Sequence, residues 1–328
     1  MTRRGWLLFS VMCVVWGIPY LFIKVAVGGV APPVVVFART AGGAAILLPV
    51  AAFTGRAEAL RIVRRHWRPL LVFAALEMIG PWLLLSDAER RLSSSMAGLL
   101  IAAVPITGIV VARLTGGTER LSRARWLGLL VGLAGVAVLA APHLEGGDAW
   151  AVVEVLLVAV GYASAPLVAA RKLTAVPTLP LIAACLTLAA LVYTPAALLT
   201  WPQSPPSGQV VGALVALATC CTALAFLVFL ELIREVGTSR AMVFTYINQA
   251  VAVAAGVVVL GEPLTVTILA AFALILTGSF LATTRQPQPS AAAPRPPRPV
   301  GAEVEAEGQP LRGPRLSPRE PRVRHMPP

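Results

Sequence analysis

A series of long, nearly uninterrupted apolar runs limits what this sequence can fold into. A helix needs roughly 20 apolar residues to cross the hydrocarbon core of a bilayer. Runs of this length are too long and too uniformly apolar for the alternating strands of a membrane barrel. We therefore predict an all-α integral membrane protein with ten transmembrane helices. The predicted spans are residues 5–27, 34–54, 68–86, 95–114, 124–141, 149–169, 178–200, 208–230, 238–260 and 264–284.

The composition agrees with a membrane protein. Hydrophobic residues make up 57% of the 328 residues and charged residues only 13%, whereas a soluble domain of this size needs more polar surface. The first apolar run follows Arg3 and Arg4 and is long enough for a retained span rather than a cleaved signal peptide. The four cysteines lie inside apolar runs and the three histidines lie outside the predicted spans. We therefore expect neither a disulfide framework nor a metal site.

The positions of the basic residues predict the orientation of the chain. If the N-terminus is cytoplasmic, 23 of the 27 lysines and arginines fall on the cytoplasmic side. This asymmetry follows the positive-inside rule, and an odd number of spans would destroy it. We therefore expect a multi-pass protein of the cytoplasmic (plasma) membrane with both termini in the cytoplasm. The net charge of +12 is a topology signal and does not indicate a nucleic-acid partner.

The segment 285–328 differs from the rest of the chain because it is rich in proline and arginine and poor in apolar residues. Such a segment cannot bury a core, so we predict a disordered cytoplasmic tail. Its arginines reinforce the orientation, and contact with anionic lipid headgroups is the alternative role.

An internal repeat divides the predicted spans into two halves. Residues 97–140 resemble residues 241–282, and both Glu119 to Glu262 and Gly135 to Gly278 are separated by 143 positions. The sequence thus predicts a first five-helix repeat at 5–141 and a second at 149–284. Because five is odd, the second repeat enters the membrane in the opposite sense. Inverted duplications of this kind are typical of secondary transporters.

Residues 246–252 (YINQAVA) lead to residues 260–265 (LGEPLT) near the end of the apolar part of the chain. Together they resemble the closing signature of a known family, the EamA-type transporters of the drug/metabolite transporter superfamily. Gln249 is a departure, because the family usually has proline there, which leaves the ninth helix without its expected kink. Other matching elements are Trp16-Gly17, Arg39, residues 93–97 ahead of Pro105, and Tyr162-Ala163 before Arg171.

This resemblance implies a transporter of two homologous halves that works by alternating access. Members of the family carry small molecules such as amino acids, other metabolites or drugs, and they usually export them. The resemblance implies neither a cofactor nor ATP hydrolysis, and the sequence has no phosphate-binding loop of the form GxxxxGK[ST]. It therefore implies that the protein is not an enzyme.

Glu77 is the leading candidate for substrate binding or ion coupling. A charge at the centre of a spanning helix costs roughly 2.5–3.5 kcal/mol, so such residues are rarely placed there without a role. Glu77 lies in the middle of the third predicted span, and Pro81 follows one turn later, where it loosens the backbone hydrogen bonding. A proton-coupling carboxylate is one interpretation, and a structural carboxylate paired on a neighbouring helix is the other. Protons are therefore a candidate coupling ion.

Aromatic and amide side chains supply the remaining candidates for a cavity. Trp16 and Tyr20 are four residues apart and Tyr246 and Gln249 three apart, so each pair shares a helical face. Tyrosine and tryptophan suit an amphipathic solute, but they also pack helices or form an aromatic belt. The further candidates of this kind are Tyr162 and Asn248, the latter equally suited to bonding between helices.

Four other charged residues have competing interpretations. Arg39 and Lys24 either snorkel or form ion pairs, or together make a positive vestibule for a carboxylate-bearing substrate. Glu154 is expected to reach the headgroups. Glu119 and Glu262 are expected to cap the helices that follow them. The spacing of Gly128 and Gly132 predicts close helix packing.

Two alternative functions remain open at this stage. One is a non-transporting scaffold that acts through the Pro/Arg tail. The other is a membrane-embedded enzyme that modifies lipids, although the sequence lacks clustered catalytic groups such as DxxxD or HExxH.

Overall fold

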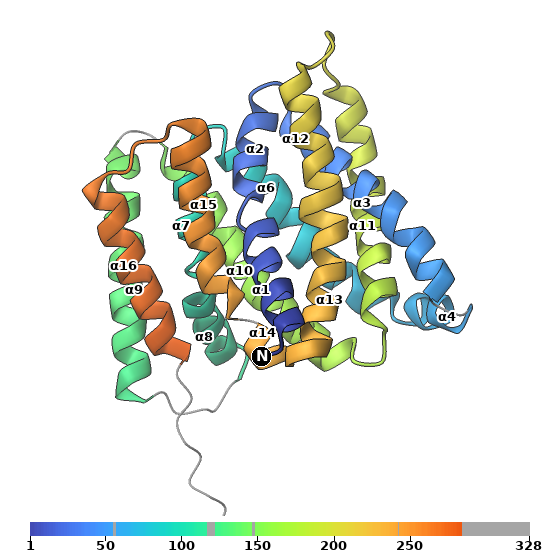
Figure 1. Ribbon diagram of the computed structural model, residues 1–328, viewed down its shortest axis with the longest axis horizontal. Helices are drawn as coiled ribbons and strands as arrows, with labels where there is room; N and C mark the ends of the chain where they lie inside the picture. Colours follow the sequence, from blue (N-terminus) through green and yellow to red (C-terminus); the bar gives the residue numbers. More distant parts are fainter. Residues whose placement is uncertain (55–56, 117–121, 146–147, 242, 284–328) are drawn as a thin grey trace, which may run out of the picture. The chain divides into compact units, whose positions relative to one another are not determined.

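The computed structural model describes residues 1–54, 57–116, 122–145, 148–241 and 243–283, and the regular elements in these ranges are all helical (Figure 1). The predicted all-α class is therefore confirmed for the described part of the chain. The predicted tail at 285–328 and the turn that contains Glu119 lie outside the described residues.

The described residues of the first half form nine α-helices and one π-helical turn. They are α1 (Arg3–Val15), α2 (Pro19–Val27), α3 (Pro32–Thr54), α4 (Ala57–Arg65), α5 (Trp67–Ala74), the π-turn η1 (Ala75–Ile79), α6 (Gly80–Ala88), α7 (Ser94–Ile101), α8 (Val104–Leu114) and α9 (Arg123–Glu145).

The second half repeats this pattern with fewer breaks. Its elements are α10 (Ala149–Lys172), α11 (Thr178–Leu199), α12 (Gly208–Ala218), the π-turn η2 (Thr219–Leu224), α13 (Ala225–Val236), α14 (Thr238–Ala241), α15 (Phe244–Leu260) and α16 (Val266–Thr283).

Eight helical segments in the described ranges are long and apolar enough to cross a membrane, where consecutive helices such as α1 and α2 count as one segment. Two further apolar helices, Phe244–Leu260 and Val266–Ala282, are shorter. The ninth predicted span is shorter than expected because α14 ends at Ala241 and α15 begins only at Phe244. The count of ten crossings stays a prediction.

Proline accounts for two breaks inside the spans. The first span breaks after Val15, and Pro19 begins α2. The fourth span breaks at Ala102–Ala103, and Pro105 lies in the first turn of α8. Proline lacks an N–H group and clashes with the carbonyl four residues earlier, so it is tolerated where a helix starts.

The two π-turns occupy matching places, because η1 begins at Ala75 and η2 at Thr219, 144 residues later. In η1, the N–H of Gly80 donates to the carbonyl of Ala75, and Pro81 follows directly. Helix α10 approaches this turn through Gly161, where a Cβ would lie 2.5 Å from the carbonyl oxygen of Leu76. The loosened backbone predicted beside Glu77 is therefore a π-turn, a feature frequent at functional sites.

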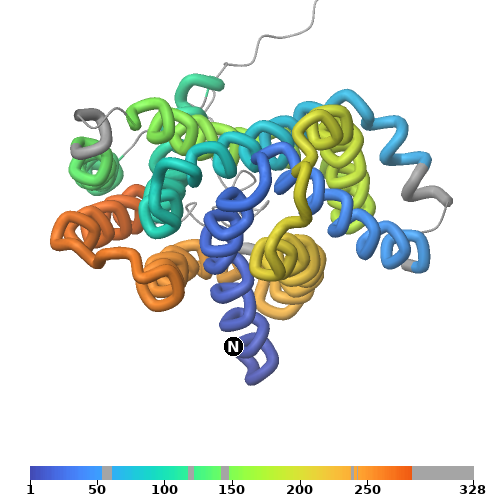
Figure 2. The backbone as a smooth tube through the Cα atoms, turned by 90° about the horizontal axis from the view of Figure 1, so that it is seen from above, coloured from blue at the N-terminus to red at the C-terminus, as the bar shows by residue number. Residues whose placement is uncertain are grey.

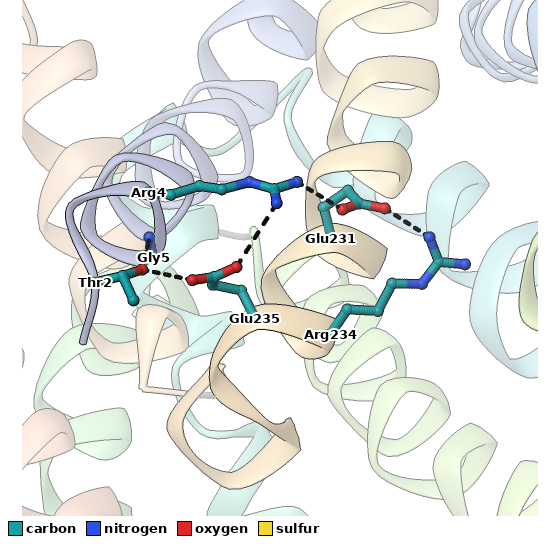
Figure 3. A network of polar contacts seen from close by, with 6 residues as sticks. All are labelled: Thr2, Arg4, Gly5, Glu231, Arg234 and Glu235. Atoms are coloured by element: carbon teal, nitrogen blue, oxygen red, sulfur yellow. Dashed lines mark hydrogen bonds and ion pairs between the residues drawn. The ribbon is translucent and has the colours of Figure 1, made fainter.

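Ion pairs identify two ends of the helical body. At the Arg4 end, Arg4 pairs with Glu231 and Glu235 of α13, and Glu231 also pairs with Arg234 (Figure 3). At the Arg91 end, Arg91 pairs with Asp87 and with Glu154 of α10.

The contacts at these ends give the relative sense of the helices. Lys24, near the end of α2, bonds to the carbonyl of Glu89 at the end of α6. Arg91 follows Glu89 and binds Glu154, which lies near the start of α10. Helix α10 therefore begins at the end of the body where α2 finishes, so the two halves of the chain start at opposite ends.

Glycines allow α9 and α16 to pack closely, and the two helices lie side by side in Figures 1 and 2. A Cβ at Gly128 would lie 2.5 Å from the backbone nitrogen of Ala282. A Cβ at Gly278 would overlap the backbone of Gly132. The close packing predicted from the Gly128/Gly132 spacing is confirmed.

Candidate functional site

Arg39 of α3 is buried between three elements and carries the positive charge of the interior. Its Nε donates to Thr222 Oγ1 of η2 at 2.9 Å, and its guanidinium carbon lies 3.7 Å from the ring centroid of Trp82. Arg39 is 7% exposed, so the snorkelling interpretation was wrong. A hydroxyl and an aromatic face replace water around the guanidinium, which lowers the cost of burying it.

Tyr20 of α2 and Gln249 of α15 face each other inside the body. Both are buried, and the Oε1 atom of Gln249 accepts no hydrogen bond from any residue that the structure describes. Gly98 of α7 lies beside them, because a Cβ there would come within 3.5 Å of Tyr20 and 3.6 Å of Gln249 Oε1. The structure therefore brings these two predicted residues together, although no kink accompanies Gln249.

Asn248 and Trp16 also meet, but in a different setting. The Nδ2 of Asn248 donates to the backbone carbonyl of Trp16 at 3.4 Å, at the break between α1 and α2. The indole of Trp16 lies 5.1–5.8 Å from three phenylalanine rings, measured between centroids. The rings belong to Phe226, Phe229 and Phe244. Trp16 thus has the contacts expected of an aromatic side chain that packs helices together.

Tyr246 points away from this group. Its hydroxyl donates to the carbonyl of Ser279 in α16 at 3.4 Å, whereas Gln249 faces α2. Both residues lie on α15, but they contact different neighbours.

Glu77 lies in η1 and is only partly buried. Its charge interacts with Tyr162 of α10 and with Cys185 of α11, the helices on which η1 packs. Tyr162 in turn interacts with Arg39 and with Tyr20. Tyr162 and Arg39 therefore lie between Glu77 and the Tyr20–Gln249 pair, because α10 lies against η1.

Lys24 is held at the Arg91 end. Its Nζ donates to the carbonyls of Glu89 at 2.6 Å and Leu92 at 2.7 Å, where the carboxyl end of α6 favours a cation. Lys24 and Arg39 therefore have different hydrogen-bond partners, and the joint vestibule stays one of the alternatives for them.

Glu154 and Glu262 have roles that differ from the predicted ones. Glu154 is 3% exposed and bonds to Arg91 at 2.7 Å, so it does not reach the headgroups. Glu262 accepts hydrogen bonds from the backbone N–H groups of Ser94 and Ser95 at 2.7 and 2.9 Å. It therefore caps α7 of the first half and not α16, which follows it in the chain.

Electrostatics favour an ionised Glu262. Burial alone would raise the pKa of this carboxyl, but hydrogen bonds from Ser95 and Ser94 hold the pKa below its usual value. Gly256 leaves room for the cap, because a Cβ there would lie 2.8 Å from the Ser94 hydroxyl.

Sequence reasoning missed Glu89. It lies outside the predicted span 68–86, yet its side chain is fully buried at the end of α6. The spacing Trp82, Leu85, Glu89 would have indicated this, since residues at i, i+3 and i+7 share the buried face of a helix.

The contacts Arg39–Thr222, Trp16–Asn248 and Ser95–Glu262 each join the two halves of the chain, and we call the boundary that they mark the seam. Unsatisfied oxygens, aromatic rings and a guanidinium meet there, a combination suited to an amphipathic solute with hydrogen-bonding groups. No group of His, Cys, Asp and Glu that could hold a metal ion occurs among the described residues.

Comparisons with known proteins agree on the class of protein, a membrane transporter. The EamA-like transporter family model matches residues 3–141 and again 149–284. The inner membrane transporter YedA of Escherichia coli K12, described as uncharacterized, is 24% identical over 76% of this chain and 81% of its own length. The uncharacterized transporter YvbV of Bacillus subtilis 168 is 26% identical over 89% of this chain and 95% of its own.

A solved crystal structure supports the same fold. It matches with a TM-score of 0.60 at 22% sequence identity and covers 86% of this chain and 98% of the other.

Proposed function

Because the chain belongs to the EamA-like transporter family, we propose that it exports a small metabolite, amino acid or drug across the cytoplasmic membrane by alternating access. The observation that carries this proposal is the seam, where buried polar groups of both halves meet in an otherwise apolar body. Polar groups buried in membrane helices are costly, and where they occur they often line the pathway of a solute.

The arrangement of the two halves supports alternating access. They start at opposite ends of the body, and each contains a π-turn at the matching position of its third span. In each half, an ion pair connects the carboxyl end of the third span to the first span of the other half. Arg91, at the end of α6, pairs with Glu154 of α10. Glu231 of α13 pairs with Arg4 of α1. We infer that these ion pairs open in turn, one end at a time.

The positive-inside rule gives the proposed orientation. The Arg4 end and both termini face the cytoplasm, and the Arg91 end faces outward. The residues proposed to contact or follow the solute are Glu77, Trp16, Tyr20, Arg39, Tyr162, Tyr246, Asn248 and Gln249.

Export is tested by comparing the metabolites of cells with and without the gene, followed by efflux of the accumulated compounds from proteoliposomes. Arg39→Ala should abolish efflux, because it removes the only positive charge proposed at the seam. An unchanged set of metabolites and no efflux of any accumulated compound would contradict the proposal.

Proton coupling through Glu77 is tested in the same vesicles with an imposed pH gradient. Efflux by the wild type should respond to the gradient, and efflux by Glu77→Gln should not. An equal response of both proteins would exclude Glu77 as the coupling group.

Deletion of residues 285–328 separates transport from the scaffold alternative. A transporter should keep its flux without the tail, whereas a scaffold that acts through the tail should lose its function.

A further inference from the structure

Glu89 has a buried carboxylate that finds no hydrogen-bond donor among the described residues. Its side chain is 0% exposed at the end of α6, one residue beyond the helix. Neither Oε1 nor Oε2 receives a hydrogen bond from any residue in the part of the chain that the structure describes. A buried carboxylate normally accepts several such bonds.

The charged groups that face Glu89 do not replace these bonds. Lys24 of α2 is the positive charge that favours an ionised Glu89 most. Its Nζ, however, donates to the backbone carbonyls of Glu89 and Leu92 and makes no ion pair with the carboxylate. Arg39 of α3 also faces Glu89, with its Nε bonded to Thr222.

The other titratable groups either disfavour a negative charge on Glu89 or interact with other residues. Glu262, in the connection between α15 and α16, repels it, and Tyr20 of α2 faces it with a neutral phenol. From α10, Glu154 is bound to Arg91, and Tyr162 interacts with Arg39 and Glu77.

An ionised carboxylate in this setting would lose its hydration and gain no donor. Such a group takes up a proton instead of remaining charged. The protonated acid has one O–H donor, and the unsatisfied acceptors of the region are oxygens, such as Gln249 Oε1 beside Tyr20.

We propose that Glu89 is a proton-binding site of this protein, occupied when the Arg91 end is closed and vacated when that end opens to water. This inference rests on the proposed alternating access, because Glu89 meets water only if the Arg91 end opens. Closing then requires a proton from the side that the Arg91 end faces, and opening releases it there. Glu89 is distinct from Glu77, which lies 12 positions earlier in the middle of the same span.

The bound proton itself is tested by infrared spectroscopy on the full chain in lipid nanodiscs. The carbonyl stretch of a protonated carboxylic acid should appear at neutral pH and shift in deuterated water. Its Glu89 component should be lost in Glu89→Gln and retained in Glu77→Gln. A band that persists unchanged in Glu89→Gln would overturn the proposal. Since this measurement needs no solute, it is independent of whether the protein transports anything.

The link to closure is tested by the labelling of buried Met96→Cys with a maleimide, in a Cys220→Ala chain whose other cysteines are buried. Exposed Arg90→Cys is the matched control, which corrects for the effect of pH on the reagent. The corrected labelling should rise by up to about tenfold per pH unit as one proton is released. Addition of Glu89→Gln should make it independent of pH.

The same rise in the presence of Glu89→Gln would show that another group controls opening and would overturn the link. The thermal stability of Glu89→Gln gives a second criterion. A neutral Glu89 predicts wild-type stability at neutral pH, whereas an ionised Glu89 stabilised by Lys24 predicts a loss in both Glu89→Gln and Lys24→Met.

Discussion

Replacement of Glu262 by glutamine should weaken the junction between the two halves of the protein. The carboxylate accepts hydrogen bonds from the N–H groups of Ser94 and Ser95 and from the Ser95 hydroxyl, at the amino end of α7. Glutamine keeps one acceptor oxygen, but its NH₂ group then points at a backbone donor.

The magnitude follows from these contacts. Hydrogen bonds to a charged acceptor contribute about 1.5–3 kcal/mol each and neutral ones about 0.5–1.5 kcal/mol, and a charge at a helix start adds about 0.3–1 kcal/mol. We therefore expect Glu262→Gln to lower the free energy of unfolding by about 2 kcal/mol. Glu262→Ala, which leaves both N–H groups unpaired, should lower it by about 3 kcal/mol.

The effect should depend on pH in a defined direction. The pKa of Glu262 is below its unfolded value of 4.5, so its stabilisation is fully present above pH 4.5. It is lost as the pH falls from 4.5 through the lower pKa of the folded state. The difference between the wild type and Glu262→Gln should therefore shrink in this acidic window.

Two measurements together test this reasoning. Denaturant unfolding in detergent micelles gives the global change, and amide hydrogen exchange of the Ser94–Ile101 segment reports on the cap itself. Glu231→Gln is the matched control, because its exposed pairs at the Arg4 end should contribute less than about 1 kcal/mol. If Glu262→Gln changes stability no more than this control and leaves exchange in α7 unaltered, the proposed cap does not stabilise the protein.

Three further substitutions test the packing and the charges. Gly278→Ala should destabilise the protein by about 1–3 kcal/mol, because its Cβ would overlap the backbone of Gly132. Gly212 has open space around it, so Gly212→Ala should not destabilise the protein, and thermal unfolding of both variants tests this. Arg91→Met should lower the free energy of unfolding by about 1–3 kcal/mol, because it leaves buried Glu154 without its partner. Arg90→Met, at an exposed position, should lower it little. Equal losses in denaturant unfolding would contradict the role of Arg91. Arg39→Lys should cost about 0.5–2 kcal/mol, since lysine does not stack on Trp82 as a guanidinium does, and unchanged tryptophan emission and unfolding would refute the stacking.

The class of fold followed from the sequence alone because hydrophobicity and helix length are local properties. Apolar runs of about 20 residues specify spanning helices whatever their neighbours are, and the spacing of Glu119 to Glu262 revealed the repeat. The breaks before Pro19 and Pro105 also have a local cause, since the missing N–H of proline acts within one turn.

The partners of the charged side chains were decided only by the tertiary structure. Arg39 finds Thr222 183 residues away, and Glu262 finds Ser95 167 residues away. A single sequence does not show which distant residues come together, so Glu154 was expected at the headgroups and Glu89 fell outside the predicted span 68–86. The packing of the two halves decides which residues meet, and the charge of each buried group depends on the residues that this packing places beside it.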